Sequence, residues 1–126
     1  MKPYVLLKVG DTDYRLRIST SAAIELEDKL NCSVVDGLNR MTEMRVLSKY
    51  IYAAARQLND NINSEGDALD LIDEYIMQGN DIEDLIDTLL DIMECSGYIK
   101  HEAVERTRDM SKKIEAQLQE KAKLLS

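Results

Sequence analysis

The sequence has no tryptophan, no phenylalanine and a single proline. Its aromatic residues are six tyrosines, so leucine, isoleucine, valine and methionine must fill most of the core. Leucine and isoleucine pack well in helical layers, and methionine fills irregular gaps. The apolar fraction of 44% is that of a globular protein. We therefore expect a globular protein that is rich in helices.

Long hydrophobic runs are missing too. No segment approaches the roughly 18 consecutive apolar residues of a membrane-spanning helix. The stretch from Met1 to Lys8 is too short, and charged too early, to be a signal peptide. We expect a cytoplasmic protein with no membrane partner.

Cysteine and histidine are scarce. Cys32 and Cys95 lie far apart, with no Cys-x-x-Cys pair, and His101 is the only histidine. This spacing excludes a zinc finger and indicates no disulfide scaffold, so we expect two reduced, mostly buried thiols. His101 begins a charged segment, where an exposed side chain is expected rather than a catalytic pair. Every glycine stands alone, so the sequence contains no glycine-rich phosphate loop.

Positive charge is in deficit. Lys and Arg number 16 against 24 Asp and Glu, giving a formal net charge of −8, which argues against a nucleic-acid partner. No Lys or Arg occurs between Arg56 and Lys100, whereas residues 99–126 are slightly basic. Carboxylate pairs such as Asp84 and Asp87 fall on polar helix faces, where solvation does not raise the pKa as acid–base catalysis requires. We expect no enzyme activity, no catalytic residues and no cofactor.

Two short strands open the chain. Tyr14, Leu16 and Ile18 alternate with arginines, and this period of two predicts a strand with one apolar face. Residues 10–13 supply turn chemistry before it. The inward residues of the preceding strand are expected to be Val5, Leu7 and Val9. A hairpin is not stable alone in water, so it should pack on the helices that follow.

Helical spacing dominates the rest of the chain. Thr20 or Ser21 is expected to cap the first helix, and Asn31 to end it in a left-handed conformation. A short helical piece is expected from Ser33, and Thr42 is the expected cap of the next helix. The apolar positions predicted for these three segments are Ala23, Ile24, Leu26 and Leu30, then Val34, Val35 and Leu38, then Leu47, Tyr50, Ile51, Ala54 and Leu58.

Two further helices are predicted between residues 64 and 98. Ser64 and Asp67 resemble a capping box, and Gly79 fits the end of that helix. Its predicted apolar positions are Ala68, Leu69, Ile72, Tyr75 and Ile76. The clearest helical period of the chain follows, at Ile82, Leu85, Ile86, Leu89, Leu90 and Met93. Residues 96–98 should break this helix.

These patterns predict an α+β fold that is mainly α, with an N-terminal β-hairpin packed on a small helical bundle over residues 1–98. A charged C-terminal helix, 99–126, forms a second segment. The core is expected to contain Leu16, Ile18, Leu26, Leu47, Ile51, Ile72, Leu85, Ile86 and Leu89.

The polar loop at residues 59–66 is the one candidate metal site. In the register of a calcium-binding EF-hand, Asn61 takes the first ligand position and Gly66 the turn, but Ile72 stands where a bidentate glutamate is required. We therefore expect an asparagine-rich loop that leads into a helix cap, and no metal.

The C-terminal helix has two interpretations. Met110, Ile114 and Leu118 form a narrow stripe at a spacing of four, which suits a partner-binding or self-associating arm. Alternatively, the helix is solvated and packs only by its first turns. A stripe this narrow anchors little by itself, so both interpretations stand at this point.

The beginning of the chain resembles one family. The strand Gly10-Asp11-Thr12-Asp13-Tyr14-Arg15-Leu16-Arg17 precedes a Ser/Thr-capped helix that reads Ala22-Ala23-Ile24-Glu25-Leu26-Glu27-Asp28-Lys29-Leu30. This order, followed by acidic amphipathic helices such as 81–94, resembles the tail assembly chaperones of long-tailed phages and prophages. The resemblance covers about residues 4–98.

The resemblance implies a binding function. Such chaperones coat the tape-measure protein and bring it to the tail-tube protein in the bacterial host cytoplasm, and they are absent from the finished virion. A longer form is often made by ribosomal frameshifting. The resemblance thus implies these two partners, and a homo-oligomer is expected. The alternative is a structural morphogenesis protein, a tail completion or connector subunit, that stays in the particle.

Overall fold

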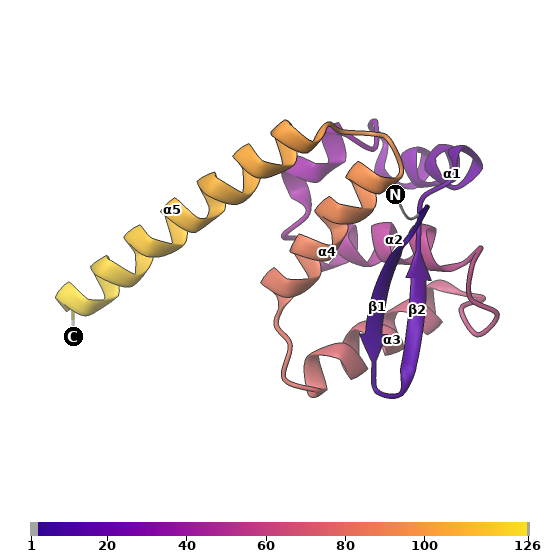
Figure 1. Ribbon diagram of the computed structural model, residues 1–126, viewed down its shortest axis with the longest axis horizontal. Helices are drawn as coiled ribbons and strands as arrows, with labels where there is room; N and C mark the ends of the chain where they lie inside the picture. The colour runs from indigo at the N-terminus through magenta and orange to yellow at the C-terminus, as the bar shows by residue number, and fades with distance from the viewer. Residues whose placement is uncertain (1–2, 126) are drawn as a thin grey trace.

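A two-stranded hairpin lies against a group of helices in the computed structural model, which describes residues 3–125 (Figure 1). The last helix projects from this body (Figure 1). The elements are β1 (Val5–Val9), β2 (Thr12–Leu16), α1 (Thr20–Leu30), η1 (Asp36–Arg40), α2 (Met44–Ala55), α3 (Glu65–Met77), α4 (Ile82–Cys95) and α5 (His101–Leu125). The predicted α+β, mainly helical fold with an N-terminal hairpin is confirmed.

The hairpin presents one face to the helices, as the alternating pattern predicts. Its strands are antiparallel, with Leu7 opposite Tyr14 and Val5 opposite Leu16. Leu7, Tyr14 and Leu16 are buried, while Val5 is half-buried because it lies at the open end of the hairpin. Gly10 has a φ of 64°, which the tight turn requires and which glycine adopts without strain.

The outer edge of β2 is covered by the end of α2 and the loop after it. Arg17 N donates a 3.0 Å hydrogen bond to the Ala54 carbonyl. The Asn59 side chain accepts from Arg15 N at 3.1 Å and donates to the Arg15 carbonyl at 2.7 Å, as a neighbouring strand would. Asn59 also donates to the Ala55 carbonyl at 2.8 Å. It thereby ends α2, and the predicted continuation to Leu58 is wrong.

Most helix ends follow from local sequence. Asn31 ends α1 with a φ of 58°, as predicted, and the predicted capping box of Ser64 and Asp67 is present. The cap of α1 is Ser19 rather than Thr20 or Ser21, because the Ser19 hydroxyl accepts from Ala22 N. Helix α2 begins after Glu43 with no side-chain cap, so the predicted Thr42 cap is wrong.

The first helical connection is shorter and tighter than expected. The Ser33 hydroxyl accepts a 3.0 Å hydrogen bond from Asp36 N, which forms a turn ahead of η1. The helical piece therefore begins at Asp36, three residues after the predicted start. Val34 is buried beneath this turn, whereas Val35 is 44% exposed.

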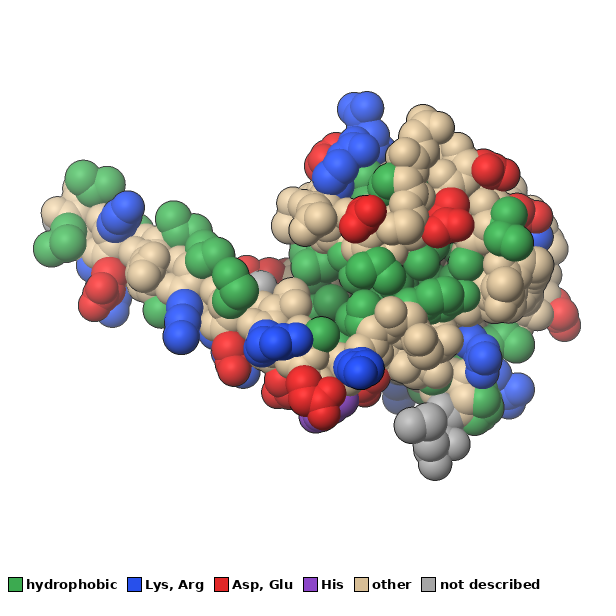
Figure 2. All heavy atoms as spheres, turned by 90° about the horizontal axis from the view of Figure 1, so that it is seen from above, with side chains coloured by type: hydrophobic (Ala, Val, Ile, Leu, Met, Phe, Trp, Pro, Cys, Tyr) green, Lys and Arg blue, Asp and Glu red, His purple; other side chains and the backbone are tan. Residues whose placement is uncertain are grey.

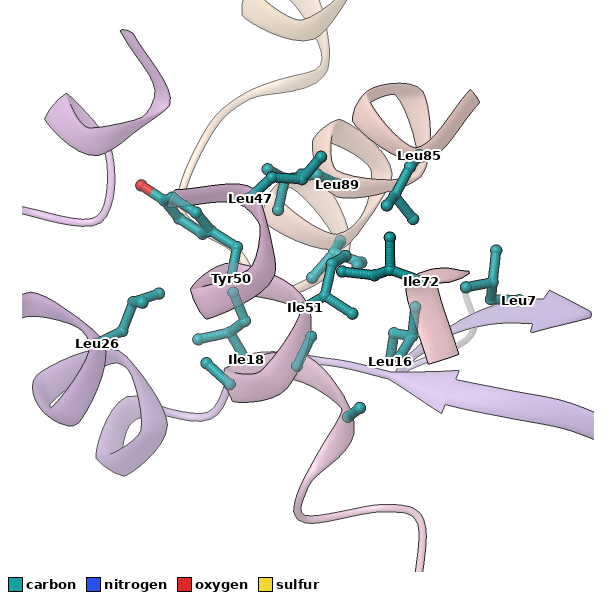
Figure 3. Packing of buried hydrophobic residues seen from close by; sticks show 14 of the residues in the cluster. Leu7, Leu16, Ile18, Leu26, Leu47, Tyr50, Ile51, Ile72, Leu85 and Leu89 are labelled. Atoms are coloured by element: carbon teal, nitrogen blue, oxygen red, sulfur yellow. The ribbon is translucent and has the colours of Figure 1, made fainter. Parts of the chain in front are cut away.

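The core lies where α2 crosses the hairpin, α3 and α4. Figure 3 shows side chains from β1, β2 and several helices directed toward one another around Ile51. Of the nine predicted core residues, the structure buries all but Ile86, which is half-buried because it faces a groove described below. The buried set is Leu16, Ile18, Leu26, Leu47, Ile51, Ile72, Leu85 and Leu89.

Three predicted apolar positions on α1 and α3 point outward, in addition to Val35 and Leu58. Ile24 is 57% exposed on α1, where the smaller Ala22 and Ala23 take the buried positions. On α3 the buried face includes Leu71, so that Leu69 and Ile76 remain exposed. An apolar side chain at the border of a helix face can lie on either side of that border, and the neighbouring elements decide which.

Candidate partner-binding surface

Helix α5 is attached to the body by its first two turns. Val104 is fully buried against it. Four residues further on, the Arg108 guanidinium donates to Asp91 at 2.6 Å and to Asp87 at 3.2 Å on α4. Partial burial acts to lower the pKa of Arg108, but the hydrogen bonds and negative charges of Asp91 and Asp87 outweigh it and raise that pKa. This charged clamp fixes α5 to α4 near the point where α5 leaves the body (Figure 1).

A groove of about 400 Å³ opens where α5 diverges from α4. One wall belongs to the body, at α4 and the turn before α2, and the other to α5 itself. The lining residues are Met41, Thr42, Glu83, Ile86, Asp87, Leu90, Arg108, Lys112, Ile114 and Leu118. The groove thus has an apolar floor with charged side chains of both signs around it.

The predicted site residues lie on the outer part of α5. Met110, Ile114 and Leu118 are 64%, 55% and 62% exposed. Ile114 and Leu118 line the groove, whereas Met110 is not among the lining residues. Figure 2 shows hydrophobic and basic side chains side by side along this projecting helix. The first turns of α5 pack on the body and the stripe beyond them is exposed, and its use as a partner-binding or self-associating arm stays a prediction.

The residues on the opposite wall were not assigned to a site from the sequence. Ile86 was predicted to be core, and Thr42 to be a helix cap. Met41 and Leu90 gave no separate signal. The apolar face of residues 82–93 is broad enough to pack on the core and to form a second surface as well. This breadth is the sequence signal that could have indicated the α4 wall of the groove.

A second exposed apolar row lies on α3. Leu69, Ile76 and Met77 are 51%, 38% and 85% exposed and recur at helical spacing. No groove accompanies them among the cavities described. None of these three residues lines the groove beside α5, so this row is a separate surface.

The asparagine-rich loop holds the fold together by hydrogen bonds. The Asn61 amide donates to the Tyr14 hydroxyl at 3.0 Å, and Asn63 N donates to the Asp67 carboxylate at 2.9 Å. Within residues 3–125, no group of three His, Cys, Asp or Glu side chains is placed to hold a metal ion. The expected absence of a metal stays a prediction.

The reactive side chains are dispersed rather than gathered. Cys32 and Cys95 are half-buried thiols, which is less burial than predicted, and burial raises the pKa of the Cys95 thiol. His101 is exposed and bonded to Glu94 at 2.7 Å. Asp73, Glu74, Asp84 and Asp87 are all exposed, as expected for the polar faces of helices.

Comparison with family models, curated proteins and solved structures finds no significant match. None of the helices within the described residues is long and apolar enough to cross a membrane.

Proposed function

We propose that this chain is a non-enzymatic tail assembly chaperone of a long-tailed phage or prophage, which binds apolar helical segments of the tape-measure protein. The tail-tube protein is the second proposed partner, and the bacterial cytoplasm the proposed location. The proposal starts from the resemblance of residues 4–98 to that family. It gives a role to the exposed apolar stripe of α5 beside the groove, since contiguous exposed apolar surface usually marks an interaction site.

The observation that carries the proposal is the groove between α4 and α5. Its floor of Met41, Ile86 and Leu90 and its wall of Ile114 and Leu118 suit one apolar face of a helix. Charged side chains of both signs surround it, and a net charge of −8 favours solubility while the groove is empty or occupied. A chaperone that shelters apolar helices needs both properties.

Co-expression tests the proposal. The tape-measure protein encoded beside this gene should be more soluble with the chain than without it. We expect the double variant Ile114→Glu/Leu118→Glu to lose this effect, because it places two charges on the groove wall. Met77→Glu is the matched control, since it adds a charge at an exposed methionine of α3, and it should retain the effect. Equal insolubility of the tape-measure protein with and without the chain would reject the proposal.

The structural-subunit alternative is separated by two other observations. A chaperone gene should lie between a tail-tube gene and a very long tape-measure gene. Mass spectrometry of purified virions should detect a tail completion or connector subunit and should miss a chaperone. Detection at stoichiometric levels would favour the alternative.

A further inference from the structure

The outer part of α5 needs a cover that its own chain does not provide. From Met110 to Leu125 its described apolar side chains are more than half exposed, at Met110, Ile114, Leu118, Leu124 and Leu125. An isolated helix of this length is only marginally stable in water, and packing of an apolar face is the usual source of its stability. The α5 stripe is therefore suited to an intermolecular contact.

The body of the same chain offers a receptor of matching shape. The groove follows α4 from Leu90 to Glu83, beyond the clamp of Arg108 on Asp87 and Asp91. Helix α4 has 14 residues and is about 21 Å long, and the 110–125 segment of α5 is about 24 Å long. The segment is therefore long enough to cover the part of α4 that lines the groove, from Glu83 to Leu90.

Charge favours the same pairing. Helix α4 carries five carboxylates and no Lys or Arg: Glu83, Asp84, Asp87, Asp91 and Glu94. The 110–125 segment carries four lysines against two glutamates, the lysines being Lys112, Lys113, Lys121 and Lys123. The lysine-bearing stripe thus meets a groove whose α4 side carries Glu83 and Asp87, while Arg108 and Lys112 line its α5 side. Such complementarity sets orientation and partner choice more than it adds affinity.

We propose that two copies of this chain form a two-fold dimer in which each inserts residues 110–125 of α5 into the α4–α5 groove of the other. A two-fold interface must be self-complementary, and each chain contains both the lysine-bearing stripe and the groove with its carboxylates on α4. Ile114 and Leu118 line the groove as well, so the two α5 helices contact one another at its wall. This dimer is a property of the chain alone and goes beyond the proposed chaperone function. Because both use the same groove, a tape-measure helix would displace the α5 segment of the other copy.

Sedimentation velocity of the full chain over a concentration series tests the dimer. The wild-type chain should show a monomer–dimer equilibrium. Ile114→Glu/Leu118→Glu should raise the dimer dissociation constant at least about tenfold by charging the stripe. Thr42→Trp should do the same by filling the groove, and it leaves the core intact because Thr42 is an exposed turn residue. Met77→Glu is the control and should leave the equilibrium unchanged.

Circular dichroism melts would establish that each variant is folded before its assembly is compared. Hydrogen exchange adds a local measurement, since amides of residues 110–125 should become protected as the concentration rises. A chain that stays monomeric overturns the proposal. So does a dimer that survives either the stripe or the groove variant, or one that Met77→Glu abolishes, because the interface then lies elsewhere.

The outcome is distinguishable from that of the proposed function. A monomer that solubilises the tape-measure protein would reject the dimer and keep the chaperone. A dimer that follows all three expectations without affecting that protein would keep the dimer and reject the chaperone.

Discussion

The hydroxyl group of Tyr50 donates a 2.6 Å hydrogen bond to the backbone carbonyl of Val34 inside the core. Tyr50 is fully buried, and this burial raises its pKa far above the ordinary value of tyrosine. The bond connects α2 to the loop that follows α1. It also leaves little room beside it, since a Cβ atom added at Gly37 would lie 2.3 Å from the Tyr50 oxygen.

Gly37→Ala should therefore destabilise the protein by about 1–3 kcal/mol, because the new methyl group must displace a buried side chain. Tyr50→Phe should cost about 1–3 kcal/mol by leaving the Val34 carbonyl without its partner. The double variant should cost clearly less than the sum, since removing the hydroxyl removes the closest contact and leaves Leu30 Cδ1 at 3.0 Å as the next one. Urea unfolding measures all three. Gly66→Ala is the control, because its Cβ would meet only the Ser64 hydroxyl, at 3.6 Å. Additive costs would contradict this packing.

The backbone of Ile18 is held by the connection between α4 and α5. Ile18 N donates to the Ser96 hydroxyl at 3.0 Å, and the Tyr98 hydroxyl donates to the Ile18 carbonyl at 3.1 Å. Ser96→Ala and Tyr98→Phe should each lower the free energy of unfolding by about 1 kcal/mol. Thermal or urea unfolding tests this, with Ser48→Ala as a control whose hydroxyl bonds only within its own helix. A lower free energy of unfolding in Ser48→Ala, with no change in Ser96→Ala and Tyr98→Phe, would be inconsistent with this role.

Leu89 tests whether α4 is a core element. It is fully buried, so Leu89→Ala should lower the free energy of unfolding by about 2–5 kcal/mol through lost contacts and a residual cavity. Leu69→Ala changes the same atoms at a side chain that is 51% exposed and should have a much smaller effect. If the melting curve of Leu89→Ala overlaid that of the parent, α4 would not contribute to the core.

The stability of the corner between α4 and α5 should depend on pH through the protonation of His101. A hydrogen bond to Glu94 and its negative charge raise the pKa of His101 above the ordinary 6.5, with smaller contributions from Glu105 and Glu102. A raised folded-state pKa stabilises the fold fully below about 6.5, and this contribution is lost as the pH rises through the folded-state value. Since His101 is the only histidine, its ring signals in an NMR titration report this value directly. Glu94→Gln should lower the pKa of His101. An unchanged pKa in that variant would contradict the ion pair between His101 and Glu94.

The sequence alone determined the features that depend on neighbours within one helical turn. The left-handed Asn31, the capping box of Ser64 and Asp67, and the burial of Leu85 and Leu89 all followed from short spacing. These interactions close within three or four residues, so the residues that make them are adjacent in the sequence. The hairpin and its inward face followed in the same way from a period of two.

Only the tertiary structure decided which surfaces are covered. Asn59 completes the edge of β2 across 44 residues of sequence, and Ser96 and Tyr98 hold Ile18 across 78 and 80. Leu69 and Ile86 share helical spacing with buried residues, yet one is exposed and the other faces the groove. Periodicity specifies which residues share a helix face, but the direction of the next element decides how far that face is buried. For the groove, that element is α5, whose Arg108 pairs with Asp87 and Asp91 of α4 and whose Ile114 and Leu118 form the other wall.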